Sequence, residues 1–142
     1  LWSGWPEAGA RVGRLQAELR AKGEDSFVFS PSYKISAMLE FYVPGQPRIY
    51  SRDVFGHPAL QFDYMPIEGN LKGATGILVT DDRRESELPL EELRPYFASV
   101  ERVDTLEISA FGRHTRRIDI YLCRDYRGYP RALRNTKNLA VR

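Results

Sequence analysis

Residues 27–51 have the sequence FVFSPSYKISAMLEFYVPGQPRIYS, and this segment predicts the centre of the fold. Its first residues, Phe27 to Ser30, favour a buried β-strand. A helix is expected next, because apolar side chains recur at the i, i+3, i+4 and i+7 spacing of one helix face: Ile35, Met38, Leu39 and Tyr42. Pro44-Gly45 ends this helix, and a short second strand at residues 48–51 completes a β-α-β unit.

The segment that follows the first strand is a candidate ligand-binding region. In a β-α-β unit these residues lie at the carboxyl edge of the sheet, where α/β proteins usually bind ligands. Here they are Ser30, Ser32, Tyr33 and Lys34. No glycine-rich phosphate loop is present, which disfavours a dinucleotide-binding enzyme. The N-terminus of the helix can still accept a phosphate with help from Lys34.

Elements on both sides extend this unit into an α/β domain. A helix is expected from Pro6 to Lys22, and a buried strand at 76–80 precedes a short helix that begins at Leu88. Two late strands, at 103–108 and 118–122, suggest a hairpin. We therefore expect a three-layer α/β domain with a mixed, mostly parallel sheet, flanking helices and a C-terminal antiparallel hairpin.

The bulk properties limit the class of protein. The 142 residues suit one domain, which we place at 1–128, followed by a basic tail at 129–142. A formal net charge of +2 is too small to indicate nucleic-acid binding, and the single cysteine excludes a disulfide framework. The tail either contacts anionic lipid or nucleic acid or is simply solvated, and it lacks the interleaved aromatic residues of a single-strand binder. Because Leu1 rather than methionine stands first, we expect a longer parent polypeptide.

No catalytic or metal-binding motif is evident. The serines near the second helix have no obvious base, and His57 and His114 lack a histidine or cysteine partner at ligand spacing. Asp81-Asp82 after a strand either binds a divalent cation or, more commonly, caps the following turn. The sequence therefore predicts no catalytic residue and no cofactor.

Glu40 and several tyrosines have two interpretations each. Glu40 lies in an apolar, aromatic segment, so it either has a ligand-related role or makes a structural hydrogen bond to the following loop. Aromatic rings can line a cleft for a sugar or a head group, although core packing is their more usual role. The tyrosines concerned are Tyr33, Tyr42, Tyr50 and Tyr64.

Several segments, taken in order, resemble the soluble C-terminal domain of bacterial glycosyltransferase family 39 proteins. This group includes relatives of the dolichyl-phosphate-mannose protein mannosyltransferases and of the aminoarabinose transferase. The resemblance extends to about Gly128. It rests on Gly4-Trp5, Ser32-Tyr33-Lys34 with Ala37, the run EFYVPGQP at 40–47, QFDY at 61–64 and LCRDYRG at 122–128. At and directly after the QFDY segment, Phe62 replaces the usual tyrosine and Met65 the usual tryptophan, and these departures argue against a ring-stacking role for that loop.

The resemblance implies a membrane enzyme that transfers a sugar from a polyprenyl-phosphate carrier to an acceptor outside the cytoplasm. Its catalytic acids lie in loops of the membrane part, so this domain is not expected to catalyse transfer alone. The parent is expected in the bacterial inner membrane, with this domain on the periplasmic or extracellular side. The expected partners are the membrane-embedded domain of the same polypeptide and a polyprenyl-phosphate sugar or an acceptor glycan or protein, with no nucleic acid.

The expected ligand surface is the carboxyl edge and the loops that follow it. Its candidate residues are Tyr33, Lys34, Glu40, Tyr42, Gln46, Gln61 and Asp63. Two alternatives remain open: a free-standing small-molecule or carbohydrate-binding α/β module, and a self-contained hydrolase or transferase. The latter needs a nucleophile with a base within about 3 Å, which the sequence does not supply.

Overall fold

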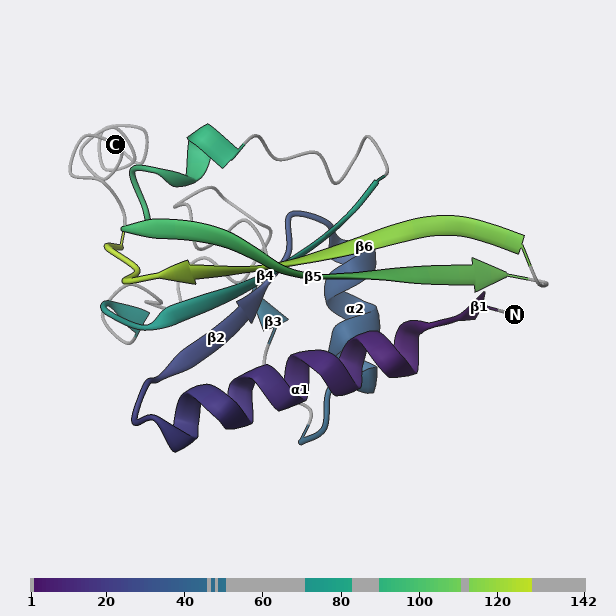
Figure 1. The fold of residues 1–142 in the computed structure, drawn as a ribbon, viewed down its shortest axis with the longest axis horizontal. Helices are drawn as coiled ribbons and strands as arrows, with labels where there is room; N and C mark the ends of the chain where they lie inside the picture. Colours follow the sequence, from purple (N-terminus) through teal and green to yellow (C-terminus); the bar gives the residue numbers. More distant parts are fainter. Residues whose placement is uncertain are drawn as a thin grey trace, which may run out of the picture.

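The computed structural model describes residues 2–45, 47, 49–50, 71–82, 90–110 and 113–128. In Figure 1 the long N-terminal helix lies on one side of the sheet and a short 3-10 helix lies on the other. The described elements, in chain order, are β1 (Trp2–Ser3), α1 (Trp5–Ala21), β2 (Ser26–Phe29), α2 (Tyr33–Tyr42), β3 (Ile49–Tyr50), β4 (Thr75–Asp81), the 3-10 helix η3 (Leu90–Leu93), β5 (Ser99–Ala110) and β6 (Arg113–Arg124).

The sheet has the strand order β1-β5-β6-β4-β2-β3. The predicted β-α-β unit is confirmed, because β2 is parallel to both β3 and β4. The predicted hairpin is also confirmed, since β5 and β6 pair antiparallel along their length. Among the described strands, three pairings are antiparallel and two are parallel, so the sheet is mixed, as predicted, but not mostly parallel. β5 runs in the same direction as β4, and the hairpin brings β6 back between them, so β6 is antiparallel to both neighbours.

One face of the sheet is covered by both α-helices. Their apolar stripes pack on alternate residues of the central strands, in what we call the helix-side cluster. Its buried members are Trp5, Ala8, Val12, Leu15, Leu19, Val28, Ile35, Leu39, Val43, Ile49, Ile77, Val79, Ile108, Ile118, Ile120 and Leu122. The α/β prediction is thus confirmed, and the two described α-helices lie on the same face.

The opposite face carries what we call the aromatic cluster, formed by strand residues of the other parity together with η3 and the turn after it. Its buried members are Phe27, Phe29, Ala74, Leu78, Leu93, Tyr96, Phe97, Cys123 and Tyr126. Phe97 stacks on Phe29, with ring centroids 5.6 Å apart. Figure 1 shows η3 on the side of the sheet away from α1. Among the described elements, η3 alone represents the third layer that we expected.

The ends of α1 follow from the local sequence. Gly4 caps its N-terminus at φ +101°, a conformation open mainly to glycine, and Pro6 and Glu7 occupy the first turn. At the other end, Gly23 has φ +80° and its N–H donates to the Arg20 carbonyl oxygen, which ends the helix. The helix therefore begins one residue before the predicted start and ends one residue before the predicted end.

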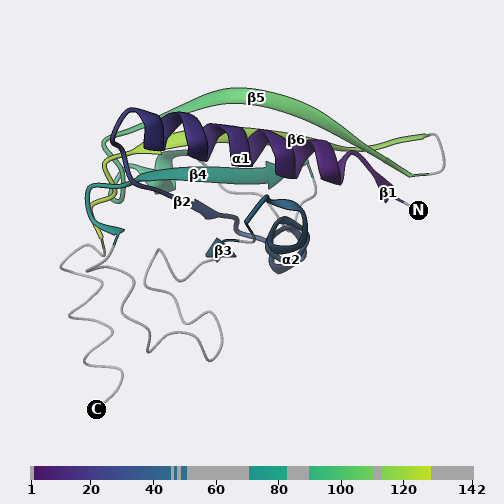
Figure 2. The same cartoon turned by 90° about the horizontal axis from the view of Figure 1, so that it is seen from below.

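α1 and α2 lie very close together where two glycines of α1 face the end of α2. A Cβ atom at Gly9 would lie 2.5 Å from the Tyr42 carbonyl oxygen, and one at Gly13 would lie 2.8 Å from Cδ of Pro44. Figure 2 shows α1 running along the sheet with α2 beside its N-terminal part. The two glycines therefore set the distance between the helices, a constraint that apolar periodicity does not reveal.

β1 is a short strand that the sequence analysis did not predict. Its residues pair antiparallel with Ser109 and Ala110 at the end of β5. Two residues are too few for a periodicity signal. Along the rest of its outer edge, β5 has no strand partner among the described elements, and its pairing with β6 shifts register between Arg102 and Asp104 and between Ile108 and Ser109.

The glycine contact generates a stability prediction. Substitution of Gly9 by alanine should lower the free energy of unfolding by about 1–3 kcal/mol, because the added methyl group clashes with the backbone of α2. The measurement is urea denaturation followed by circular dichroism.

The control for this variant is the neighbouring exposed position Ala10, where Ala10→Gly should cost roughly 1 kcal/mol through helix propensity alone. Helix propensity by itself predicts that Gly9→Ala stabilises the protein. A Gly9→Ala protein at least as stable as the natural one would contradict the close contact.

Candidate functional site

The start of α2 is a serine-rich turn at the carboxyl end of β2. Ser32 caps the helix, its Oγ accepting from the Ile35 N–H at 3.5 Å, and Ser30 Oγ accepts from the Ser32 N–H at 3.3 Å. Both serines are buried, as is Ser36 one turn later. Ser36 Oγ has no hydrogen-bond partner in the described structure. The predicted carboxyl-edge region is therefore built mainly from hydroxyl groups that hold the helix start.

The predicted ligand residues on α2 do not converge on one surface. Lys34 and Glu40 are exposed, and the helical rise of 1.5 Å per residue separates them by about 9 Å along the axis. Tyr42 is half-buried against the helix-side cluster. Tyr33 is the first residue of α2. The remaining candidates, Gln46, Gln61 and Asp63, lie outside the described residues.

The segment FYVPG at 41–45 ends α2 and turns the chain, and we call this turn the corner. One aromatic ring of the corner, that of Phe41, is exposed. Val43 is buried, and Gly45 turns the chain at φ +82°. Phe41 is 69% exposed, and its ring meets that of Tyr42 edge-on with centroids 4.8 Å apart. The corner therefore holds an apolar aromatic side chain in solvent, which a purely structural motif does not require.

A polar cluster on β5 and β6 was not singled out from the sequence. Asp119 is buried, and its Oδ1 accepts from the Thr105 hydroxyl at 2.9 Å, while Oδ2 lies 3.4 Å from Nε of Arg117. Burial and the nearby Asp119 carboxylate raise the pKa of Tyr121. Because Thr105 and Arg117 each contact one oxygen of the Asp119 carboxylate, this cluster has the features of a structural network.

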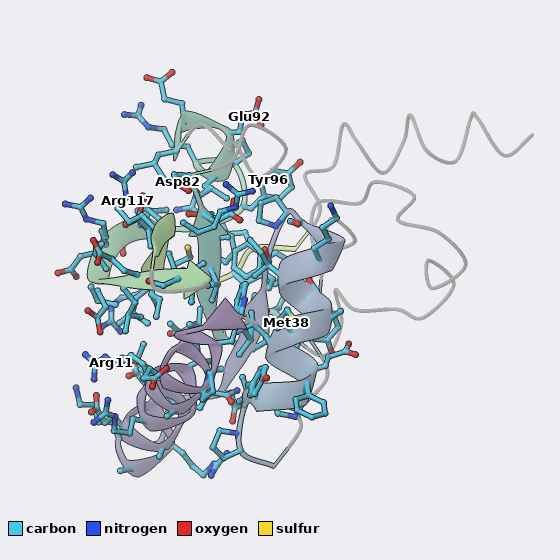
Figure 3. All side chains as sticks on the ribbon, turned by 90° about the vertical axis from the view of Figure 1, so that its right-hand side faces the viewer. Arg11, Met38, Asp82, Glu92, Tyr96 and Arg117 are labelled. Carbon is cyan, nitrogen blue, oxygen red and sulfur yellow. The ribbon has the colours of Figure 1, made fainter. Side chains whose placement is uncertain are left out.

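The Asp81-Asp82 pair does not form a cation site within the described structure. Asp81 is buried and Asp82 exposed, since successive strand residues point to opposite faces. The Asp82 N–H donates to the Arg117 carbonyl oxygen at 3.1 Å, and both residues are labelled in Figure 3. Across the described ranges, no three His, Cys, Asp or Glu side chains are grouped closely enough to hold a metal ion.

A pocket of about 280 Å³ lies at the other end of the sheet, near the C-terminus of α1. Gln16 and Arg20 of α1, the turn residues Glu24 and Asp25, and Ser26 at the start of β2 line it. The sequence analysis missed it, because its residues belong to four segments and only the polar turn after Gly23 signals it locally.

The comparisons with known proteins give no assignment. No family model matches the chain, and neither the curated proteins nor the solved structures include a match. No helix in the described part of the chain has the length and apolar character needed to cross a bilayer.

Cys123 generates a reactivity prediction. It lies buried in the aromatic cluster, and burial raises the pKa of its thiol to about 12. Since the thiolate is the reactive form, a thiol reagent at pH 8 should label the folded protein very slowly and the urea-unfolded chain fast. The labelling rate of each form, followed by mass spectrometry, is the measurement.

The same shift predicts a loss of stability at alkaline pH. The thiol has a pKa of 9.0 in the unfolded chain and about 12 in the folded protein. The stability that the protonated thiol gives the folded state is therefore complete below pH 9 and declines between these two pH values. A Cys123→Ala variant should lack that decline.

Equal labelling rates of the folded and unfolded chains by the thiol reagent would contradict the buried placement of Cys123.

Proposed function

We propose that this chain is an extracytoplasmic accessory domain of a membrane glycosyltransferase that uses a polyprenyl-phosphate-linked sugar. The support is the ordered resemblance of five segments to the soluble C-terminal domain of glycosyltransferase family 39 proteins. In this proposal the membrane-embedded part of the same polypeptide, in the bacterial inner membrane, carries out the transfer. The domain lies on the periplasmic or extracellular side and supports that part or holds the donor or acceptor.

The observation that carries the proposal is the corner at the end of α2. The most specific part of the resemblance, the run at 40–47, coincides with this corner. Its neighbours are held by α1 through Gly9 and Gly13, yet Phe41 points into solvent with 69% of its surface exposed. An exposed aromatic ring is suited to docking against another apolar surface. We assign that surface to the membrane-embedded part of the same polypeptide.

The alternative function is a free-standing carbohydrate or small-molecule-binding α/β module. The observation that favours it is the polar pocket near the C-terminus of α1. This alternative needs neither a membrane part nor an exposed docking ring. The two functions therefore differ in what they require of Phe41.

The first test is made on the complete reading frame that contains residues 1–142. Bacterial membranes that carry its product should transfer a radiolabelled sugar from a polyprenyl-phosphate carrier to an acceptor, and a reporter fused after Arg142 should be active only outside the cytoplasm. A reading frame without membrane-spanning segments, or a reporter that is active in the cytoplasm, would contradict this proposal and favour the free-standing module.

The second test compares two exposed apolar residues in that full protein. Phe41→Ser should reduce sugar transfer about tenfold, equivalent to about 1.4 kcal/mol of docking energy. Leu90→Ser is the matched control, because Leu90 is 47% exposed and lies in η3 on the opposite face of the sheet. Both changes should leave the thermal stability of the isolated chain within about 0.5 kcal/mol. Equal transfer by the two variants would overturn the docking role of Phe41.

A further inference from the structure

We propose that the pocket at the C-terminus of α1 binds one neutral sugar ring through hydrogen bonds to its hydroxyl groups. The pocket lies at the amino ends of β2 and β4, away from the carboxyl edge at which α2 begins. None of its residues belongs to the predicted ligand surface. The assignment rests on the pocket itself and does not depend on a membrane parent.

A fixed turn places two carboxylates at this pocket. After α1, the N–H groups of Lys22, Gly23 and Glu24 all donate to carbonyl oxygens of Leu19 or Arg20, at 2.9–3.0 Å. These bonds fix the backbone from which the Glu24 and Asp25 side chains project. The turn therefore fixes the backbone positions of the two acidic residues before any ligand arrives, which reduces the backbone entropy lost on binding.

Contacts to the neighbouring strands fix the turn further. The Asp25 carbonyl oxygen accepts from the Thr75 N–H of β4 at 2.9 Å. The Glu24 carboxylate lies 3.4 Å from a guanidinium nitrogen of Arg124, at the end of β6. The turn that lines the pocket is therefore connected to the sheet at two points, through β4 and β6.

The lining provides both partners that a sugar hydroxyl needs, since a hydroxyl donates one hydrogen bond and accepts others. Arg20 supplies donors only, Glu24 and Asp25 supply acceptors only, and the Gln16 amide and Ser26 hydroxyl can do both. Gln16 and Arg20 stand four residues apart on α1, so they lie on the same helix face. Neighbouring hydroxyls of a sugar ring can therefore be bound from the helix and from the turn.

The charges in and beside the pocket favour a neutral ligand. Glu24 and Asp25 give two negative charges, and Arg20 with the adjacent Arg124 gives two positive charges. A phosphate would lie against the two carboxylates, and an amine would lie against the two guanidinium groups. The attraction and repulsion of a charged ligand therefore offset each other, whereas neutral hydroxyl groups can form hydrogen bonds with both the carboxylates and the guanidinium groups.

The volume suits a small ligand. The pocket's volume of about 280 Å³ lies just below the roughly 300–1,000 Å³ of pockets that hold drug-sized ligands, which fits a single sugar ring. The buried Ala74 and the half-buried Leu71 add apolar surface for the carbon–hydrogen face of the ring. A ligand this small with an open, solvated rim should bind with a dissociation constant on the order of 1 mM.

The test is an NMR titration of the isotopically labelled chain, residues 1–142. Glucose, galactose and mannose are added separately, with glucosamine and glucuronate as charged probes. The expected result is saturable movement of the backbone amide signals of Arg20, Glu24, Asp25 and Ser26 with at least one neutral sugar. Arg20→Ala should weaken that binding at least tenfold. Arg14→Ala is the matched control, because Arg14 is exposed on α1 and lies outside the pocket lining, and it should leave binding unchanged.

Three outcomes would overturn the inference. They are the absence of saturable movement with all three neutral sugars, an equal effect of Arg20→Ala and Arg14→Ala, and tighter binding of glucosamine or glucuronate than of any neutral sugar. The sugar-transfer assay on the full protein is independent of this titration. Sugar binding without sugar transfer would support the pocket assignment and contradict the proposed membrane enzyme. Sugar transfer without sugar binding would support the membrane enzyme and contradict the pocket assignment.

Discussion

The structure depends on the burial of β4 on both of its faces. Ile77 and Val79 pack under the helices, whereas Leu78 and the backbone of Gly76 lie under the aromatic cluster. A Cβ atom at Gly76 would lie 2.7 Å from the Phe29 ring, so this ring packs directly on the strand backbone. Because β4 joins the parallel pair β2-β3 to the antiparallel hairpin, its two-sided burial lets two different kinds of sheet share one core.

Much of this architecture follows from local patterns. The β-favouring run Phe27–Ser30, the helical spacing of Ile35 and Leu39, and the alternation in β6 each identify an element, and the structure has each of them. The relative placement of α1 and α2 could not be derived in this way. It depends on which backbones can approach, and that is decided by Gly9 and Gly13, whose missing side chains leave no trace in an apolar pattern.

The candidate sites were less predictable than the fold, for a related reason. Lys34 and Glu40 are close in sequence and of the right chemical type, but the helix separates them along its axis and points them away from each other. The residues of the pocket, such as Gln16 and Asp25, come together only through the turn after α1 and the pairing of β2 with β4. Ordered resemblance indicates a family of functions, whereas a binding surface requires contacts between segments that no short motif encodes.

The outer edge of β5 has a consequence for the protein at high concentration. A twelve-residue edge strand normally offers free backbone groups to a second molecule, and this is how sheets aggregate edge to edge. Here two register shifts interrupt the strand, and Glu101, Arg102, Asp104 and Glu107 place charges of both signs along it. A second molecule would have to match this irregular strand and desolvate its charges at once. The edge is therefore protected against strand addition, although among the described strands only β1 covers part of it.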